Sequence, residues 1–202
     1  MAKEKNGHLS GKVGDKIHST WNGRPYVRRM PESVANPRTE AQQSHRRAFA
    51  AVASLSNTMK WGHKIGLHAL AQKEMLDTSS IFKRINKDCY GPDGIDYARV
   101  IISYGSVTSA FVTSAEINAQ GGIHVTFQSN VTPANKDDEF YLFVCCPDER
   151  EGLCVEPVAR TIGEVRATIR PNWGGHPLHF YAFMKGKKGR TSNSQYVGQF
   201  QV

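Results

Sequence analysis

The residues that could carry chemistry in this sequence are histidines, a hydroxyl-rich loop, four cysteines and a group of arginines. His63 and His68 are five positions apart in a segment with helical periodicity, about 140° around the axis, so they do not share a helix face. The loop at 103–110, "SYGSVTSA", lacks the Gly-x-Ser-x-Gly elbow and an accompanying acid and histidine pair. We therefore expect no enzymatic activity, no metal and no cofactor.

The cysteines stand at positions 89, 145, 146 and 154. Because Cys145 and Cys146 are adjacent, a strand would direct their side chains to opposite faces and prevent a shared metal site. Buried free thiols are the interpretation that this spacing favours over disulfides or metal ligands.

The arginines lie in the first quarter of the chain and alternate with aromatic residues. Arginine binds phosphate or carboxylate with two parallel hydrogen bonds, and aromatic rings can stack on bases, which suits a nucleic acid. The same residue types are enriched at the centres of protein interfaces. The candidate interaction residues are Trp21, Arg24, Tyr26, Arg28, Arg29, Arg38, Gln42, Arg46, Arg47 and Phe49.

The net charge of +8 is unevenly distributed. Residues 1–60 contain eleven Lys or Arg and four Asp or Glu, a net charge of +7, whereas residues 61–202 contain fifteen and fourteen, a net charge of +1. This asymmetry indicates a basic front segment that meets an acidic surface or a polyanion, although such segments are also often simply solvated.

Residues 1–35 are rich in Gly and basic groups and show no helical period, which is typical of an extended arm. Within the arm, "IHSTWNGRPYVRR" places two short β-compatible runs around Asn22-Gly23, the dipeptide that best tolerates a type I′ hairpin turn. An isolated hairpin is marginal in water, so its apolar residues need another surface, on the same chain or on a neighbour.

Residues 36–94 are predicted to form two or three helices. The first helix begins in one of two ways. It starts at Pro37 with Asn36 as its cap, or it starts after Thr39, which forms a capping box with Gln42. Phe49, Val52, Ser56 and Met59 then follow one stripe, with Ala48, Ala51 and Leu55 beside it. A second helix is predicted around Trp61, Ile65, His68 and Ala69, and a third after the caps at 77–80, with Ile81, Phe82 and Ile85 as its apolar residues.

Residues 95–202 contain short β-rich runs at the 8–12 residue spacing of an antiparallel sandwich. In the run at 122–128, apolar residues alternate with polar ones, and in the run at 179–184 they alternate with His, Tyr and Phe. One side of each strand should therefore be core. The acidic run 137–139 is predicted at a hairpin tip, as is the Gly-Lys-Lys-Gly segment 186–189. The runs are "ARVIIS", "AEINAQGGIHVTFQS", "DEFYLFVCC", "CVEPVA", "EVRATIRP", "LHFYAFM" and "SQYVGQFQV".

From the first Gly-x-x-Gly stretch onward, the chain resembles a family of uncharacterised Bacteroidota proteins. The motif that carries the resemblance is Asn-Pro-x-Thr-x-x-Gln-x-x-x-Arg-x-x-Phe, matched here by Asn36, Pro37, Thr39, Gln42, Arg46 and Phe49. The resemblance extends over nearly the whole chain and implies no catalytic residues. Similar segments occur in small proteins from phage and prophage structural regions, which implies a role in assembly.

The sequence thus predicts an α+β protein: an extended N-terminal arm with a small hairpin, two or three helices, and a C-terminal seven-stranded immunoglobulin-like or fibronectin-III-like β-sandwich. We expect a non-enzymatic structural subunit that docks, through its arm and first helix, on other copies of itself or on a neighbouring protein in a virion-like or filament-like assembly. The alternative is a basic nucleic-acid-binding protein whose arm contacts phosphates.

The chain has no apolar run long enough to cross a membrane, and no apolar stretch follows its basic N-terminus. We therefore expect no membrane insertion and synthesis in the cytoplasm without a signal peptide. The final site would be a virion, an extracellular assembly or the cytoplasm.

Overall fold

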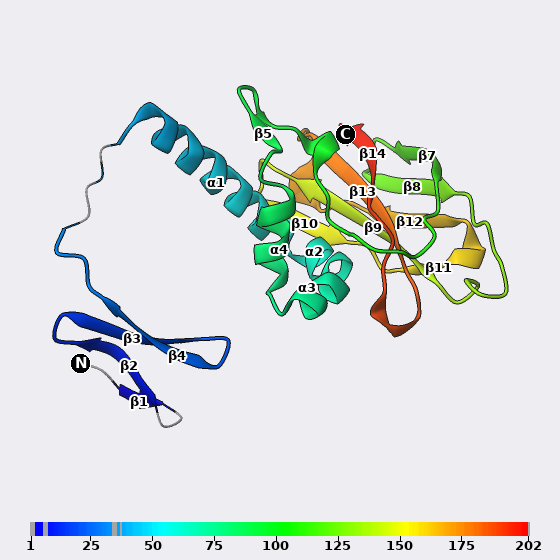
Figure 1. The fold of residues 1–202 in the computed structure, drawn as a ribbon. Helices are drawn as coiled ribbons and strands as arrows, with labels where there is room; N and C mark the ends of the chain where they lie inside the picture. The colour runs from blue at the N-terminus through cyan, green and yellow to red at the C-terminus, as the bar shows by residue number, and fades with distance from the viewer. Residues whose placement is uncertain (1–2, 6–7, 34–35, 37, 202) are drawn as a thin grey trace. The chain divides into compact units, whose positions relative to one another are not determined.

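The protein, seen in a computed structural model that describes residues 3–5, 8–33, 36 and 38–201, forms two compact units, Met1–Glu40 and Ala41–Val202. The first unit is a small antiparallel sheet, and the second combines helices with a β-sandwich, so the protein is mixed helix and sheet (Figure 1).

The first unit is a four-stranded sheet in the order β1-β2-β3-β4. The hairpin predicted at Asn22-Gly23 is confirmed: both residues have positive φ angles, 47° and 78°, as a type I′ turn requires. The rest of the predicted extended arm forms two further strands, which the sequence analysis did not expect. The strands are β1 Lys3–Lys5, β2 His8–Val13, β3 Lys16–Trp21 and β4 Arg24–Arg29.

The second unit begins with four α-helices rather than two or three. The segment predicted as the second helix forms both α2 and α3, separated at Leu67, although the Leu67 N–H still donates to the His63 carbonyl at 2.9 Å. The predicted cap of the last helix is confirmed, because the Asp77 carboxylate accepts from the Ser80 N–H at 2.9 Å. The helices are α1 Glu40–Thr58, α2 Lys60–Gly66, α3 His68–Glu74 and α4 Thr78–Ile85.

Helix α1 begins at Glu40, directly after Thr39, in agreement with the capping register that starts at Thr39. Arg38 has a φ of 50°, a left-handed conformation that a right-handed helix cannot include, so the helix cannot begin at position 37. The predicted role of Pro37 itself lies outside the described residues.

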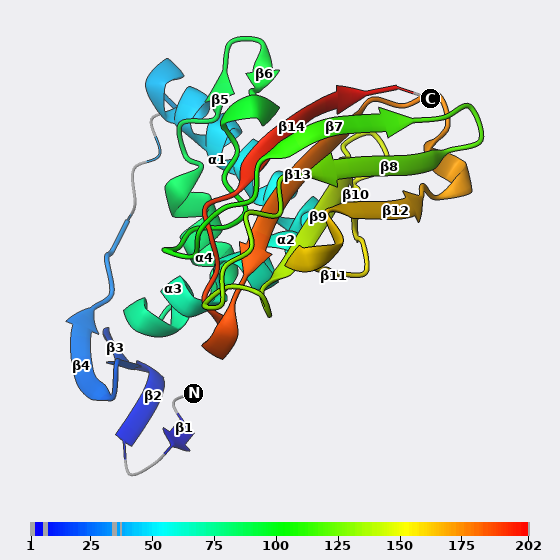
Figure 2. The same ribbon diagram turned by 90° about the vertical axis from the view of Figure 1, so that its right-hand side faces the viewer.

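The sandwich consists of a three-stranded sheet, β12-β8-β7, and a five-stranded sheet, β10-β9-β13-β14 with β11 on β9 (Figure 2). The predicted number of seven strands is one too low: the run 98–103 forms no strand, the run 115–129 contains parts of two strands, β7 and β8, and β11 adds a two-residue strand beside β9. A separate two-stranded ribbon pairs β5 with β6. The strands are β5 Tyr90–Gly91, β6 Gly94–Ile95, β7 Val112–Ile117, β8 Gly122–Phe127, β9 Glu139–Cys146, β10 Glu151–Cys154, β11 Val158–Ala159, β12 Glu164–Thr168, β13 Leu178–Lys185 and β14 Gln195–Phe200.

Two hydrophobic cores lie on the two faces of the β9–β13 sheet. Val125 and Phe180 belong to the core between the sheets, whereas Phe143 and Tyr181 belong to a second core with Phe82 and other helical residues. The alternation predicted for β8 is confirmed, but β13 is buried on both faces because the helices cover its outer side. The β13–β14 hairpin ends, as predicted, in the segment 186–189.

Two predictions about the sandwich are wrong. The run 98–103 forms no strand, because the backbone of Ile101 bonds to the side chain of Asn86 on both its N–H and its carbonyl, at 2.7 and 2.9 Å. The acidic run 137–139 is not a hairpin tip, because it lies between β8 and β9, which belong to different sheets, and Asp138 is buried beside Arg160 at 3.6 Å.

Candidate interaction surface

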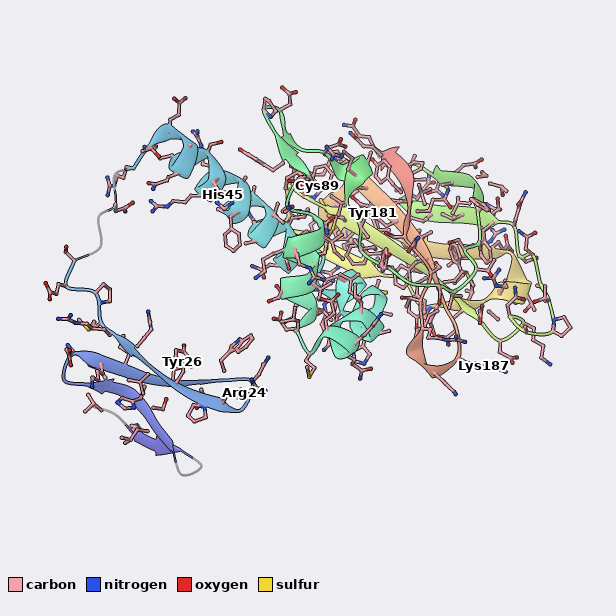
Figure 3. The ribbon with its side chains drawn as sticks, viewed as in Figure 1. Arg24, Tyr26, His45, Cys89, Tyr181 and Lys187 are labelled. Carbon is pink, nitrogen blue, oxygen red and sulfur yellow. The ribbon has the colours of Figure 1, made fainter. Side chains whose placement is uncertain are left out.

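The pairing of β3 with β4 sorts the candidate residues of the first unit by face. Residues directly opposite each other in an antiparallel pair share a face, and successive residues alternate between faces. Trp21 pairs with Arg24, Ser19 with Tyr26, and Ile17 with both Arg28 and Lys12 of β2. One face therefore presents Lys12, Ile17, Trp21, Arg24, Tyr26 and Arg28, and we call it the cationic face (Figure 3 labels Arg24 and Tyr26).

The opposite face holds Arg29, the neighbour of Arg28 in the chain, and Lys16, which lies directly across the ladder from Arg29. The Arg29 guanidinium lies 3.7 Å from Asp15 and 3.2 Å from Glu32, so its charge is partly compensated. Within the part of the chain that the structure describes, no carboxylate pairs with Lys12, Arg24 or Arg28. The two faces thus differ in charge balance.

The first unit has no core of its own. Among its described side chains none is buried, and both hydrophobic cores are built from Val52 onward. Trp21 is 70% exposed and Tyr26 is 44% exposed. A single sheet layer normally buries one face against another element, so these rings have no such partner within the unit.

The remaining candidates lie on or beside the first three turns of α1. Gln42, Arg46 and Arg47 are exposed, and Phe49 is 58% exposed, with the Lys83 ammonium 6.0 Å from its ring centroid. From Val52 on, the helix enters the second core. The predicted stripe is therefore buried except at its start.

The structure brings four of the predicted residues together, Trp21, Arg24, Tyr26 and Arg28. Arg29 is on the other face, Arg38 lies in the segment between β4 and α1, and Gln42, Arg46, Arg47 and Phe49 belong to the second unit. Lys12 was not among the predicted residues. The period of two in "RPYVRR" and the register set by Asn22-Gly23 could have assigned the faces of β3 and β4, and the two-residue turn Gly14-Asp15 could have paired β2 with β3.

The residues considered for catalysis have structural roles. Ser103 is buried and donates to the carbonyls of Ser192 at 2.6 Å and Gly66 at 3.2 Å. His63 is buried, and its Nε2 donates to the Ser56 carbonyl at 2.9 Å. Burial lowers the pKa of His63, so its neutral form is favoured. No group of three His, Cys, Asp or Glu among the described residues is placed to bind a metal ion.

The cysteines are free thiols. Cys145 faces the helical core and Cys146 faces the core between the sheets, so their side chains point to opposite faces, as the strand alternation predicted. Burial raises the pKa of Cys145, and it raises that of Cys154 to about 11. These thiols therefore stay protonated near neutral pH and are poor nucleophiles.

Comparisons with known proteins identify a family and similar solved structures. The model of a "Family of unknown function (DUF6266)" matches residues 7–198. The solution structure of the fn3 domain of human collagen alpha-1(XX) chain matches 50% of this chain and 90% of that chain, at 10% sequence identity and a TM-score of 0.36. No curated protein matches the chain. In the described part of the chain, no helix has the length and apolar character needed to cross a membrane.

Proposed function

We propose that this chain, which belongs to the DUF6266 family of unknown function, is a non-enzymatic structural subunit that docks on another molecule through its N-terminal unit and the start of α1. The partner is another copy of the chain or a neighbouring protein in a virion-like or filament-like assembly. Repetition of such a head-to-tail contact would produce a ring or a fibre.

The observation that supports this proposal most is the sheet without a core. A sheet of four short strands gains its stability from a covered apolar face, and the described side chains of the first unit bury none. On the face opposite the cationic face, Val13 is 45% exposed and Val27 is 54% exposed, and full burial of a valine side chain contributes about 1.5–3 kcal/mol relative to exposure. The first unit therefore gains its missing stabilisation when a partner covers it.

The exposed start of α1 provides a second element for the same role. Phe49 lies in the exposed part of α1, just before the helix enters the second core. Ala48, the residue before Phe49, has a small side chain. Small residues allow another backbone to approach closely. This part of α1 therefore offers a partner the exposed Phe49 side chain, with the basic residues Arg46 and Arg47 nearby in the helix.

We also propose that the C-terminal sandwich is a fibronectin-III-like scaffold. It consists of two packed sheets, one of three strands and one of five that includes β11 on β9, and this two-sheet architecture is the one that fibronectin type III domains share with immunoglobulin domains. In this role the sandwich holds the helices and presents the docking elements.

The proposal is tested by comparing the full chain with residues 41–202 in sedimentation across protein concentration. The shorter chain keeps both cores, so we expect the same thermal unfolding midpoint but no concentration-dependent association. Phe49→Ala should weaken association about tenfold or more, whereas Ile162→Ala, at a position 59% exposed on the sandwich, serves as the matched control. Association of residues 41–202 equal to that of the full chain would refute the proposal.

A further inference from the structure

The cationic face combines exposed aromatic rings with uncompensated positive charge. Lys12, Arg24 and Arg28 share this face with Trp21 and Tyr26, and no described carboxylate pairs with any of the three cations. The carboxylates of Asp15 and Glu32 instead pair with Arg29 on the opposite face. The cationic face therefore carries three cations without a described carboxylate partner, whereas the opposite face carries one such cation, Lys16, beside the paired Arg29.

This composition does not suit a self-complementary contact. Two copies of the cationic face would place three cations against three cations, which is repulsive. Arg, Trp and Tyr are also enriched at protein hot spots, but Lys is depleted there, and hot-spot anchors are ringed by contacts that exclude water. Here the rings are instead bordered by cations, and Trp21 is 70% exposed.

The chemistry of the face matches a chain that offers both negative charge and planar rings. Arginine binds phosphate with two parallel hydrogen bonds, and Trp and Tyr rings stack on bases of any sequence. Duplex bases are already stacked on one another, so only an unpaired strand exposes the planes that Trp21 and Tyr26 could cover. The whole chain, with a net charge of +8, attracts a polyanion at long range.

We propose that the cationic face binds single-stranded nucleic acid, with phosphates on Lys12, Arg24 and Arg28 and bases stacked on Trp21 and Tyr26. The binding has little sequence preference, because neither stacking nor phosphate contacts read base edges. This inference rests on the proposed function only in taking the N-terminal unit as a docking element.

The test uses the full chain, a fluorescently labelled 30-residue oligo(dT) and its duplex, with binding measured by anisotropy between about 50 and 300 mM salt. Adjacent residues of β4 provide matched pairs, because they project to opposite faces. Arg28→Gln should reduce the salt slope by about 0.7 and Arg29→Gln should leave it nearly unchanged. Tyr26→Ala should weaken binding about tenfold, whereas Val27→Ala should change it less than twofold.

Three results would overturn the inference: no binding to oligo(dT) at low salt, tighter binding to the duplex, or equal losses in both members of a pair. Sedimentation of the same variants without nucleic acid separates this inference from the proposed function. If the Arg28→Gln chain loses association but oligo(dT) never binds, the face docks on a protein and the nucleic-acid inference fails. If oligo(dT) binds but the wild-type chain never associates, the structural role fails instead.

Discussion

Asp138 and Arg160 form an ion pair inside the second unit, with 3.6 Å between Oδ2 and Nη2. The Arg160 side chain is fully buried, and its guanidinium also donates to the carbonyls of Ser129, at 3.1 Å, and Thr108. One cation thus connects the segments before β7, after β8 and before β9. Buried charges require this degree of pairing to offset their desolvation.

Removal of Arg160 should destabilise the second unit strongly. Arg160→Met leaves the Asp138 carboxylate and two carbonyls buried without their partner, which should lower the free energy of unfolding by about 3–5 kcal/mol. Arg166→Met is the control, because Arg166 pairs with Glu164 at 3.2 Å but is 70% exposed, and should cost less than about 1 kcal/mol. Urea unfolding measures both; similar losses in the two variants would contradict the assigned role of Arg160.

The stability of the protein should fall in acid because of His179. Its Nδ1 lies 2.9 Å from the Tyr196 hydroxyl, its ring stacks on Tyr97, and burial lowers its pKa to about 4. The unfolded state, with a histidine pKa near 6.5, binds the proton first as the pH falls. The stabilisation is therefore complete above about pH 6.5 and is lost toward pH 4, by roughly 3 kcal/mol in total.

The measurement is urea unfolding at several pH values between 7.5 and 4 for the wild type and His179→Gln. The difference in unfolding free energy between the two chains should shrink as the pH falls, because only the wild type carries this penalty. His68→Gln, at an exposed position on α3, is the control and should follow the wild type. A pH-independent difference would mean that His179 is protonated equally in both states.

The contact between α2 and the segment after residue 100 requires glycine at position 66. A Cβ on Gly66 would lie 2.4 Å from the Ile102 carbonyl oxygen and 2.6 Å from Ser103 Cβ, and the Gly66 carbonyl also accepts from Thr191 at 2.9 Å. Gly66→Ala should therefore destabilise the protein by about 2–3 kcal/mol. Gly91→Ala, where nothing lies within 4 Å, should have an effect within about 0.5 kcal/mol in the same thermal unfolding experiment. Equal midpoints for the two variants would refute this close packing.

Local signals in the sequence predicted those elements whose hydrogen bonds and core contacts are local. Asn22-Gly23 fixed a hairpin, Asp77 capped α4, and the alternation in β8 matched its buried face. The part of the candidate surface that lies on β3 and β4 can be predicted from the same hairpin, because the hairpin register alone assigns Trp21 and Arg24 to one face.

The rest depended on contacts between distant segments. Residues 98–103 have the composition of a strand, yet Asn86 and Ser194 supply their hydrogen bonds through side chains. The burial of both faces of β13 required the helices to pack on its outer side, which no periodicity within β13 indicates. Lys12 is an exception, because it joins the cationic face through the local β2–β3 hairpin at Gly14-Asp15.

The first unit should show little hydrogen-exchange protection in the unassembled chain. Amides of β9 and β13 exchange only through opening of a core, which costs several kcal/mol, whereas β3 and β4 have no buried side chains to hold their ladder closed. We expect protection in β3 and β4 to be weaker by a factor of about a thousand or more, corresponding to a difference of about 4 kcal/mol. Mass-spectrometric exchange of dilute full-length chain measures it, and addition of a partner should raise protection in β3 and β4 while that in β9 stays unchanged. Equal protection of β3 and β9 in the dilute monomer would show that the sheet is stable without a partner.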